Sequence, residues 1–384
     1  MHLMVVLEDR ISEWDAKGEI LDGYFNPAGA FDSVTVLGLV DDRPDEATIA
    51  RLCAPARHRY LNAGIDRREL MFATFGLRPG RLASWLGRLT GDVASDPPDI
   101  VRAYGDGLAA VAAAVIGRAA QIPYAVSIHT TPDPQIQSRY LGARDRLWRR
   151  LLEPSVHRAL RDAGAVMAVY APIRDYLPAD IAEKAVVVPN VVGIGARETV
   201  GPSGSGPMQA LWLGRQMPGR DPRPIIAALN VTPNVELTLV GDGLLHDAAR
   251  RMVEDTGLER RTTFIRAIEN RELCAKLPAY DVLVVNSAFR EMPKTVMEAT
   301  LSGLPVIVNR LPAAESPEYS NLPVLFVDAG SGSYASALRD LESNSRKRIT
   351  LARATQDAAW QLWDPDKVAT QTADILRALV TGAH

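Results

Sequence analysis

The chain has 384 residues, of which 47% are hydrophobic and 23% charged, and its formal net charge is −3. This length exceeds what one hydrophobic core usually serves, so two domains are expected. The small net charge argues against a whole-chain field that would attract nucleic acid. The 2 cysteines, Cys53 and Cys274, are far apart and lack the spacing of a metal site. They favour a reducing compartment over a disulfide framework.

The first half of the chain alternates short apolar runs with helical patterns. Its opening segment, MHLMVVLEDR, has no basic leader and is predicted to be a strand rather than a signal peptide. Continuous apolar runs are typical of parallel strands that are covered on both faces. The strands expected in this half are 2–7, 34–40, 100–104, 124–129, 165–169 and 185–189.

A second alternating series follows a segment that is dense in Gly, Ser and Pro, GARETVGPSGSGP, residues 195–207. This composition predicts a linker between an N-terminal domain, 1–194, and a C-terminal domain, 208–363. The second series has expected strands at 210–214, 236–241, 263–266, 282–287, 306–309 and 324–327, and closing helices at 333–362 and 366–380. The pattern predicts two doubly wound α/β domains facing across a cleft, with ligands beyond the carboxyl ends of the strands.

The segment VNSAFREMPKTVMEATLSGLPVIVNR, residues 285–310, predicts a helix between two strands. Pro293 suits the first turn of that helix because its missing N–H costs nothing there. Lys294 adds positive charge where unpaired amides and the helix dipole favour an anion. Glu298 is expected one turn further, where its carboxylate would accept hydrogen bonds from a ribose diol. The alternative is a plain helix with an exposed glutamate and a solvated lysine.

The loop LWLGRQMPGRDPRP follows the first strand of the second series. Gly214 ends that strand, and Arg215 and Arg220 flank a tight turn, so the two guanidiniums would form a clamp for a diphosphate. Surface charge is the alternative. In the loop LVGDGLLHDAAR, Gly241 begins a strand–helix turn, but His246 occupies the third glycine position of a dinucleotide fingerprint, which argues against a nicotinamide or flavin site.

Polar residues of the first domain are weaker candidates. His129 ends a predicted strand in VSIHTTPDPQ, with Asp133 four residues on, and is a candidate polar contact. Lys17, Gly18 and Glu19 follow the first strand. The glycine there would let the backbone approach a ligand, or would only turn the chain.

An acidic cluster lies in the loop VDDRPDE. Asp41, Asp42 and Asp45 resemble a metal-binding pattern. We predict a solvated loop instead, because nothing else with metal-ligand character lies nearby in the sequence.

Together these segments resemble the GT-B glycosyltransferases, specifically family 4 of the retaining, nucleotide-sugar-dependent enzymes. The resemblance is carried in the second domain by GRQMPGR, LVGDGLL and REMPKTVMEATLSGLPVI. It is weaker in the first, where KGEI, YFNP, PDIVRAYG, SIHTTPD and VVVPN carry it. The last segment, WQLWDPDKVATQTADILRALV, resembles the closing helix of this fold, so residues 364–384 are expected to pack back on the first domain.

The resemblance implies a role for each matching residue. Arg215 and Arg220 would hold the donor diphosphate, Glu298 the ribose, and His129 the transferred sugar, while Asn190 matches an asparagine at the interdomain crossing. The implied catalytic residues are His129, Arg215, Arg220 and Glu291; the donor-binding residues are Gly214, Gly241, Arg266, Arg290, Met292, Pro293, Lys294, Thr295 and Glu298; the acceptor-side residues are Lys17, Gly18, Glu19 and Asp133.

The sequence departs from the family pattern at two loops. Arg290 stands where the family has the first of two glutamates, and Glu291 stands in a slot usually filled by glycine. Either Glu291 takes the sugar-reading role, or Arg290 reads a different donor, or activity is altered or lost. Arg266 stands where glycine is common near the nucleobase, and Arg220 replaces the usual lysine while keeping its charge.

The function expected from these features is transfer of a sugar from a nucleotide-sugar donor to a glycan or glycolipid. Two arginines, a lysine and a helix dipole would stabilise the departing diphosphate, so no metal and no other cofactor are expected. One alternative is a GT-B sugar-nucleotide epimerase, which would need acidic groups around the sugar. Another is a nucleotide-sugar-binding protein without transferase activity. The sugar, base, acceptor and oligomeric state stay open.

An arginine-rich helix is predicted over 139–161. It carries seven arginines (139, 144, 146, 149, 150, 158 and 161), with Trp148 and leucines on the other side. Such a helix fits the surface of an anionic membrane, which would place a cytoplasmic protein on the inner face. The alternative is a core helix with a solvated arginine face.

Overall fold

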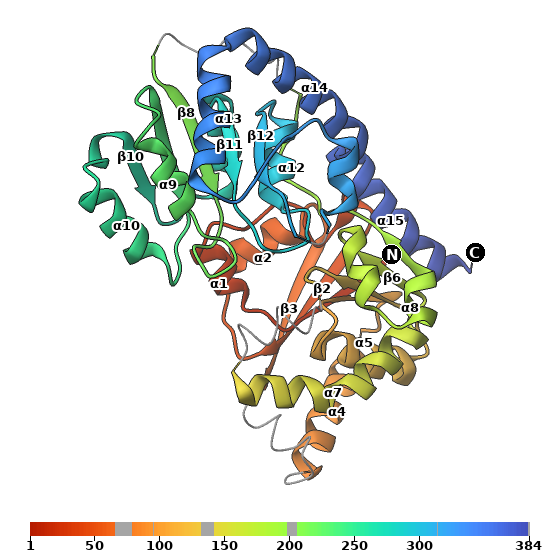
Figure 1. Ribbon diagram of the computed structural model, residues 1–384. Coiled ribbons are helices and arrows are strands. Elements are labelled where there is room, and N and C mark those ends of the chain that lie inside the picture. Colours follow the sequence, from red (N-terminus) through yellow and green to blue (C-terminus); the bar gives the residue numbers. More distant parts are fainter. Residues whose placement is uncertain (66–78, 95, 132–141, 198–205, 313, 383–384) are drawn as a thin grey trace. The chain divides into compact units, whose positions relative to one another are not determined.

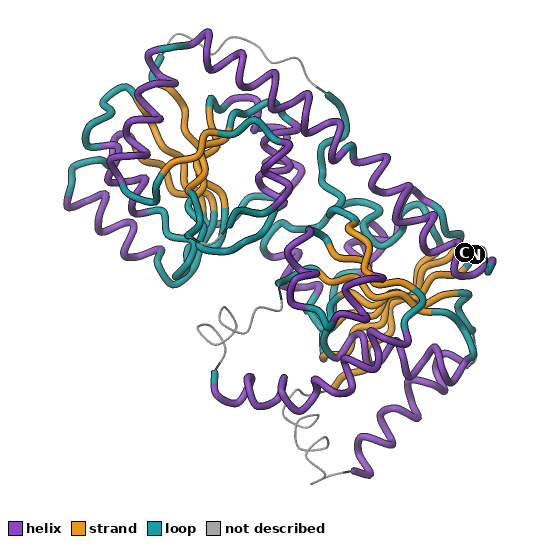
Figure 2. The backbone as a smooth tube through the Cα atoms, turned by 45° about the vertical axis from the view of Figure 1, so that its right-hand side comes forward, coloured by secondary structure: helices purple, strands orange, loops and turns teal. Residues whose placement is uncertain are grey.

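The computed structural model describes residues 1–65, 79–94, 96–131, 142–197, 206–312 and 314–382 (Figure 1). The chain forms two compact units, Met1–Val191 with Asp366–His384 and Val192–Pro365. In each unit a parallel sheet lies between helices (Figure 2). This architecture confirms the prediction of two doubly wound α/β domains. Residues 198–205 of the predicted linker lie outside the described residues.

The first unit contains a seven-stranded parallel sheet with the order β3-β2-β1-β4-β5-β6-β7. Strand order reverses between β1 and β4, which is the topological switch point of such a sheet. The inner strands are almost fully buried, as expected for apolar runs between two helical layers. The strands are β1 His2–Leu7, β2 Ser33–Val40, β3 Arg57–Ile65, β4 Ile100–Tyr104, β5 Tyr124–Ile128, β6 Ala165–Ala168 and β7 Ala185–Val187.

The helices of the first unit cover both faces of this sheet. The last of them, α15, contributes Leu376 to the same hydrophobic core as Leu3 and Val34 of the first two strands. Arg377 of α15 also donates to the carbonyl oxygen of Ala30 at 3.0 Å. The helices are α1 Ile11–Ala16, α2 Glu46–Cys53, α4 Pro79–Ala94, α5 Leu108–Ala120, α7 Ala143–Asp162, α8 Ala179–Lys184 and α15 Pro365–Thr381.

The second unit contains a six-stranded parallel sheet with the order β10-β9-β8-β11-β12-β13. Its core packs Trp212 and Tyr334 among aliphatic side chains of the strands and of α9 and α13. The strands are β8 Met208–Leu213, β9 Val235–Val240, β10 Thr262–Ile265, β11 Val282–Val285, β12 Val306–Asn309 and β13 Leu325–Val327. The helices are α9 Arg223–Leu229, α10 His246–Asp255, α11 Asn270–Lys276, α12 Lys294–Leu301, α13 Ser331–Ser343 and α14 Ser345–Trp363.

The structure corrects three sequence expectations. Strand β3 was not predicted, because it lies at the sheet edge and its mostly exposed side chains, RHRYLNAGI, leave no apolar run. The helix expected over 333–362 is two helices, since Asn344 interrupts it and its side chain caps α14 by accepting from the N–H of Lys347 at 2.9 Å. Asp42 is not solvated: it is 7% exposed and accepts hydrogen bonds from the N–H and hydroxyl of Ser12 at the start of α1.

Candidate functional site

The candidate site of the second unit lies at the carboxyl ends of β9, β8 and β11. These strands are neighbours, and the strand order reverses between β8 and β11. Ligands of doubly wound sheets bind at such a reversal. The loops that leave these three strands span residues 214–222, 241–245 and 286–293.

The loops after β8 and β9 pack backbone against backbone. The N–H of Gln216 donates to the carbonyl of Asp242 at 2.9 Å, and the N–H of Leu245 donates back to the carbonyl of Gln216 at 3.0 Å. A Cβ at Gly241 would lie 2.0 Å from the carbonyl oxygen of Gly214, and φ at Gly241 is +129°. Glycine is therefore required at 241 to let the two loops approach, which explains this residue as part of the loop framework.

The loops after β8 and β11 are also joined. The N–H of Ala288 donates to the carbonyl of Gly219 at 2.7 Å, and the side-chain amide of Asn286 donates to the carbonyl of Asp221 at 2.8 Å. Within the first loop, Met217 and Arg220 exchange two backbone hydrogen bonds of 3.1 and 2.8 Å. This tight turn presents Arg220 beside the β11 loop.

Arg220 forms an ion pair with Glu291. The Nη2 of Arg220 lies 2.6 Å from Oε1 and 2.7 Å from Oε2 of Glu291, and Nε lies 3.1 Å from Oε1. The guanidinium also lies over the ring of Phe289, 5.1 Å from its centroid. The structure thus brings together Arg220 and Glu291, two of the predicted catalytic residues, which are 71 positions apart in sequence.

Arg215 differs from Arg220 in its surroundings. Its side chain is exposed, and it makes no ion pair or hydrogen bond with any other residue that the structure describes. A guanidinium in this state at a strand end keeps its full charge and all its donors for a ligand.

The helix α12 begins directly after the β11 loop, which is joined to the turn that carries Arg220. Pro293 is its N-cap, with φ −67° and ψ 142°, so Lys294 is the first helical residue and Thr295 the second. The carbonyl of Pro293 accepts from the N–H groups of Val296 and Met297 at 3.1 and 3.2 Å. The helix therefore offers its first amides and a lysine at one end, which is an anion-binding arrangement. Met292, just before the cap, is buried at 3% exposed.

Glu298 lies in the second turn of α12 and is 1% exposed. Burial raises the pKa of its carboxyl group, against the opposing effects of the Lys294 charge and of the hydrogen bond from Asn270. The Nδ2 of Asn270, the first residue of α11, donates to Oε1 of Glu298 at 2.8 Å. The exposed glutamate of the plain-helix alternative is therefore wrong, because this carboxylate lies inside the unit.

The loops after β9 and β10 meet through an ion pair. The Nη1 of Arg266 lies 2.6 Å from Oδ2 of Asp242. The hydrogen bond from the N–H of Gly243 is the largest cause that lowers the pKa of the Asp242 carboxyl group, and Arg266 lowers it further. His246 opens α10 beneath this pair and is 2% exposed, with its ring edge-on to Phe264. Arg266 is thereby directed toward the β9 loop at the rim of the site.

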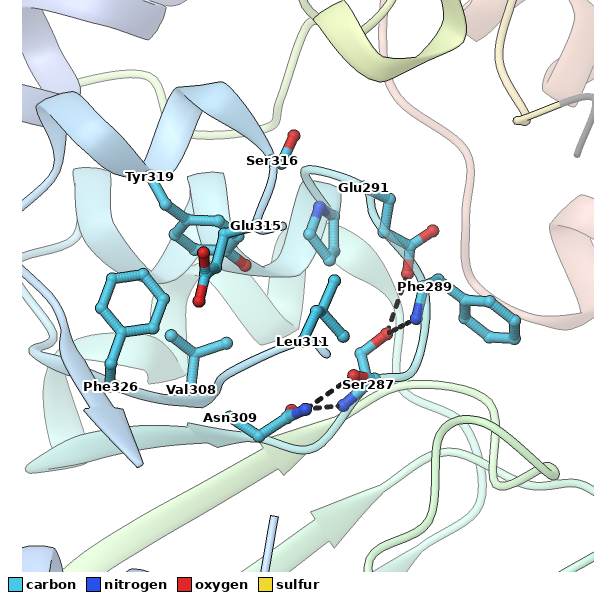
Figure 3. A pocket seen from close by; sticks show the side chains of 11 residues that line it. Ser287, Phe289, Glu291, Val308, Asn309, Leu311, Glu315, Ser316, Tyr319 and Phe326 are labelled. Carbon is cyan, nitrogen blue, oxygen red and sulfur yellow. Dashed lines mark hydrogen bonds between the residues drawn. The ribbon is translucent and has the colours of Figure 1, made fainter. Parts of the chain in front are cut away.

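The β11 loop borders a depression that encloses about 300 Å³, including its opening to solvent (Figure 3). Asn309 at the end of β12 fixes one wall, because its side chain exchanges hydrogen bonds of 2.8 Å with the N–H and carbonyl of Ser287. The Nε of Arg290 donates to the carbonyl of Glu315 at 3.1 Å. The lining residues are Ser287, Phe289, Glu291, Pro293, Val308, Asn309, Leu311, Glu315, Ser316, Tyr319 and Phe326.

In the first unit, His129 follows β5 directly and belongs to a packed cluster. Its Nδ1 lies 3.1 Å from Oδ1 of Asn190, and its ring stacks on Tyr104 at 4.8 Å. The guanidinium of Arg102 lies over the ring of Tyr104, 4.4 Å from its centroid, and the Nε of Arg102 donates to the hydroxyl of Ser127 at 2.9 Å. His129 and Asn190, both implied by the resemblance, are therefore neighbours.

The other predicted residues of the first unit have different surroundings. Lys17 is the C-cap of α1 and Gly18 follows it with φ +70°, while the N–H of Glu19 donates to the carbonyl of Trp14 at 2.8 Å. These contacts end a helix, as left-handed glycines commonly do. Asp133 lies outside the described residues.

Several polar residues of the site were not predicted. Gln216, fully buried between two loops, donates through Nε2 to the carbonyl of Gly241 at 2.8 Å. Asn270 and Asn309 bind Glu298 and Ser287 from neighbouring elements. Only position could have indicated them: Gln216 follows β8, Asn309 ends β12, and Asn270 is the first residue of α11.

Within the described ranges, no three His, Cys, Asp or Glu side chains group as metal ligands. None of the helices that the structure describes is both long and apolar enough to cross a membrane.

Two protein-family models match the chain. The model described as glycosyl transferase 4-like domain matches residues 28–191, and the model described as glycosyl transferases group 1 matches residues 223–344. One match falls in each of the two units.

Relatives with assigned activities match this chain over only part of their own length. A 2-deoxystreptamine N-acetyl-D-glucosaminyltransferase of Streptomyces fradiae is 28% identical over 289 residues, which are 68% of this chain and 66% of that protein. A D-inositol 3-phosphate glycosyltransferase of Corynebacterium urealyticum is 29% identical over 132 residues, which are 34% of this chain and 31% of that protein. The match thus spans less than two thirds of these two relatives.

Solved structures share the whole fold at low sequence identity. HepE of Anabaena in complex with UDP has a TM-score of 0.72 and 18% identity, covering 98% of this chain and 100% of that chain. A sucrose-phosphate synthase of Thermosynechococcus elongatus has a TM-score of 0.68 and 15% identity, covering 100% of both chains. HepE has also been solved with UDP-glucose. These likenesses confirm the predicted GT-B fold.

Proposed function

Because the chain belongs to the glycosyltransferases of the GT-B fold, we propose that it transfers a hexosyl group from a UDP-sugar to a hydroxyl of a glycan or glycolipid. UDP is proposed as the donor nucleotide because HepE binds it and shares the fold. Transfer is favoured over epimerisation because the named relatives are transferases.

The observation that carries the proposal is the convergence of positive groups at the reversal between β8 and β11. Arg215 is exposed, Arg220 projects from a tight turn joined to the β11 loop, and Lys294 begins α12 directly after that loop. In our proposal the diphosphate lies among these groups. Guanidinium and amide donors fixed before the reaction stabilise the charge that grows on the departing UDP.

Each remaining donor contact follows from this placement. Glu298 would accept from the ribose hydroxyls, and Arg266 and Gly241 would border the base and phosphates. Met292, Pro293 and Thr295 would face the sugar–phosphate junction. His129, whose ring is held by Asn190 and Tyr104, would meet the transferred sugar.

Metal independence and retention are part of the same proposal. Two arginines, one lysine and the helix N-terminus supply the charge neutralisation that a divalent ion provides in other transferases. Retention of the anomeric configuration follows from the resemblance to family 4. We place Lys17, Gly18 and Glu19 on the acceptor side. There the acceptor would approach the backbone of Gly18, which follows the end of α1.

Product analysis tests the proposal. The protein is incubated with UDP-glucose and UDP-N-acetylglucosamine, with glycan and lipid extracts as acceptors and with or without EDTA. Nuclear magnetic resonance follows the anomeric proton. Transfer gives free UDP and a new glycoside with the donor's configuration, unaffected by EDTA. Isomerised donor would identify an epimerase, and binding without UDP release would identify a binding protein.

We also propose that α7 places the protein on an anionic membrane. Leu147 and Leu151, one helical turn apart, are 52% and 42% exposed. Arg146, Arg149 and Arg150 are exposed around them. Exposed leucines flanked by arginines are typical of helices that lie in the headgroup region, and a lipid-linked acceptor would be presented there.

A further inference from the structure

Glu291 binds two of the three nitrogens of the Arg220 guanidinium. Glu291 occupies Nε and Nη2 at 2.6 to 3.1 Å, whereas Nη1 donates to no residue that the structure describes. The Arg220 side chain is 33% exposed and that of Glu291 only 12% exposed. Two N–H groups of Arg220 therefore stay open while its carboxylate partner lies more deeply buried.

The carboxylate partner is itself held by its loop. Oε1 of Glu291 lies 3.5 Å from the hydroxyl of Ser287, which accepts from the N–H of Phe289 at 3.1 Å (Figure 3). Ser287 is fixed by two hydrogen bonds to Asn309 at the end of β12. The Phe289 ring lies under the guanidinium. The sheet thus defines the position of Glu291, and Glu291 defines the position of Arg220.

We propose that Glu291 is a positioning residue, which holds Arg220 so that its Nη1 donors meet the donor diphosphate. This inference rests on the proposed function and names a different role for Glu291 than reading the sugar hydroxyls. An arginine restrained in this way loses little further rotamer freedom when it binds a phosphate, so more of the interaction energy appears as affinity.

Glu291 acts on a diphosphate in two opposing ways. Restraint of Arg220 favours binding, while the negative charge of the carboxylate opposes it. Glu291→Gln removes the charge but keeps an oxygen that accepts from Arg220. Glu291→Ala removes both the charge and the restraint. A comparison of these two variants therefore isolates the positioning effect from the charge effect.

The experiment is a double-mutant cycle on UDP affinity. Calorimetry measures the Kd of UDP and of UDP-glucose for the wild type, Glu291→Gln and Glu291→Ala, each with Arg220 intact and in an Arg220→Met background. Positioning predicts that Glu291→Ala binds UDP about fivefold or more weakly than Glu291→Gln when Arg220 is present. It predicts equal affinities when Arg220 is methionine, because nothing remains to be positioned.

A second variant covers the case in which Glu291→Ala fails to fold, which thermal unfolding without ligand will show. Glu291→Asp keeps the charge but withdraws the carboxylate by one methylene, so UDP should bind about fivefold more weakly than to the wild type. Wild-type affinity in Glu291→Asp would overturn the proposal.

The other outcomes are equally decisive. Equal UDP affinity of Glu291→Gln and Glu291→Ala with Arg220 present would overturn positioning. A difference that persists in the Arg220→Met background would show that Glu291 acts independently of Arg220. Unchanged UDP affinity with a loss confined to UDP-glucose would identify Glu291 as a sugar-reading residue. A wild type that binds no nucleoside diphosphate would overturn the proposed function together with this inference.

Discussion

The α-carbon of Gly241 faces the carbonyl oxygen of Gly214 so closely that a Cβ on Gly241 would lie 2.0 Å from that oxygen. The contact is between two backbones, so no side chain can move to relieve it. Gly241→Ala should therefore lower the free energy of unfolding by about 2 kcal/mol or more, and should weaken UDP binding by separating the loops after β8 and β9. Urea unfolding and calorimetry measure the two effects.

Gly257→Ala is the matched control for this prediction. Gly257 also has a positive φ, +66°, but a Cβ there would meet nothing within 4 Å. Its substitution should cost only the conformational strain, about 1 kcal/mol, and should leave UDP affinity unchanged. Equal losses in the two variants would show that the loop contact does not matter.

The buried carboxyl group of Glu298 should lower the stability of the fold when it is ionised, although it is proposed to bind the ribose of UDP. Burial raises the pKa of this carboxyl group, so its contribution to stability is full below the ordinary glutamate value of 4.5 and is lost as the pH rises through the raised pKa. Glu298→Gln is neutral throughout. It should unfold at a higher urea concentration than the wild type at pH 8, and the gap should close as the pH falls toward 4.5.

The same substitution should weaken the binding of UDP about 10-fold to 100-fold, because charge-assisted hydrogen bonds contribute about 1.5–3 kcal/mol. Glu254→Gln, which changes an exposed carboxylate on α10, should alter neither property. If Glu298→Gln binds UDP as the wild type does, the ribose contact proposed for Glu298 is wrong.

The two residues that form the Arg220–Glu291 pair also show where sequence reasoning ended. Arg220 was singled out because it follows a strand whose carboxyl end should face a ligand, and Glu291 because it lies next to a position where the family pattern has a glutamate. Their ion pair joins positions 71 apart and depends on the turn geometry of both loops, which no local pattern encodes. Sequence position therefore indicated that both loops lie at one sheet edge, but it did not predict the ion pair between them.

The buried strands of both sheets could be predicted from the sequence, whereas the edge strand β3 could not. All predicted strands occur with ends within two residues, because burial on both faces leaves continuous apolar runs. Strand β3 was not predicted because a strand at the sheet edge does not need a continuous apolar run. The prediction for Asp42 was wrong because the sequence does not show that this carboxylate accepts hydrogen bonds from Ser12, 30 positions away, in the first turn of α1.

The α7 surface gives a prediction that is independent of the donor site. Vesicles that contain phosphatidylglycerol should bind the protein, and vesicles of phosphatidylcholine alone should not. Arg149→Glu with Arg150→Glu should reduce binding about 10-fold or more, since each basic residue near an anionic surface contributes about 1 kcal/mol. Leu147→Ser with Leu151→Ser should reduce it without changing the charge. Co-sedimentation measures each case.

A control for vesicle binding is Arg251→Glu on α10, which changes the net charge by the same amount per residue on the other unit. Equal losses from Arg251→Glu and from either α7 arginine alone would indicate a general charge effect. Binding that does not depend on anionic lipid would contradict the role of α7.

The most direct measurement is the affinity of the wild type and of Arg215→Met for UDP and for uridine, by calorimetry at fixed ionic strength. Diphosphate recognition by Arg215 predicts that the wild type binds UDP more tightly than uridine. It also predicts that Arg215→Met loses about 10-fold or more of the UDP affinity while uridine binding is unchanged. Arg251→Met, on an exposed arginine of the same unit, should have no effect. Equal affinity of the wild type for UDP and uridine, or an Arg215→Met variant that binds UDP like the wild type, would contradict the proposed donor site.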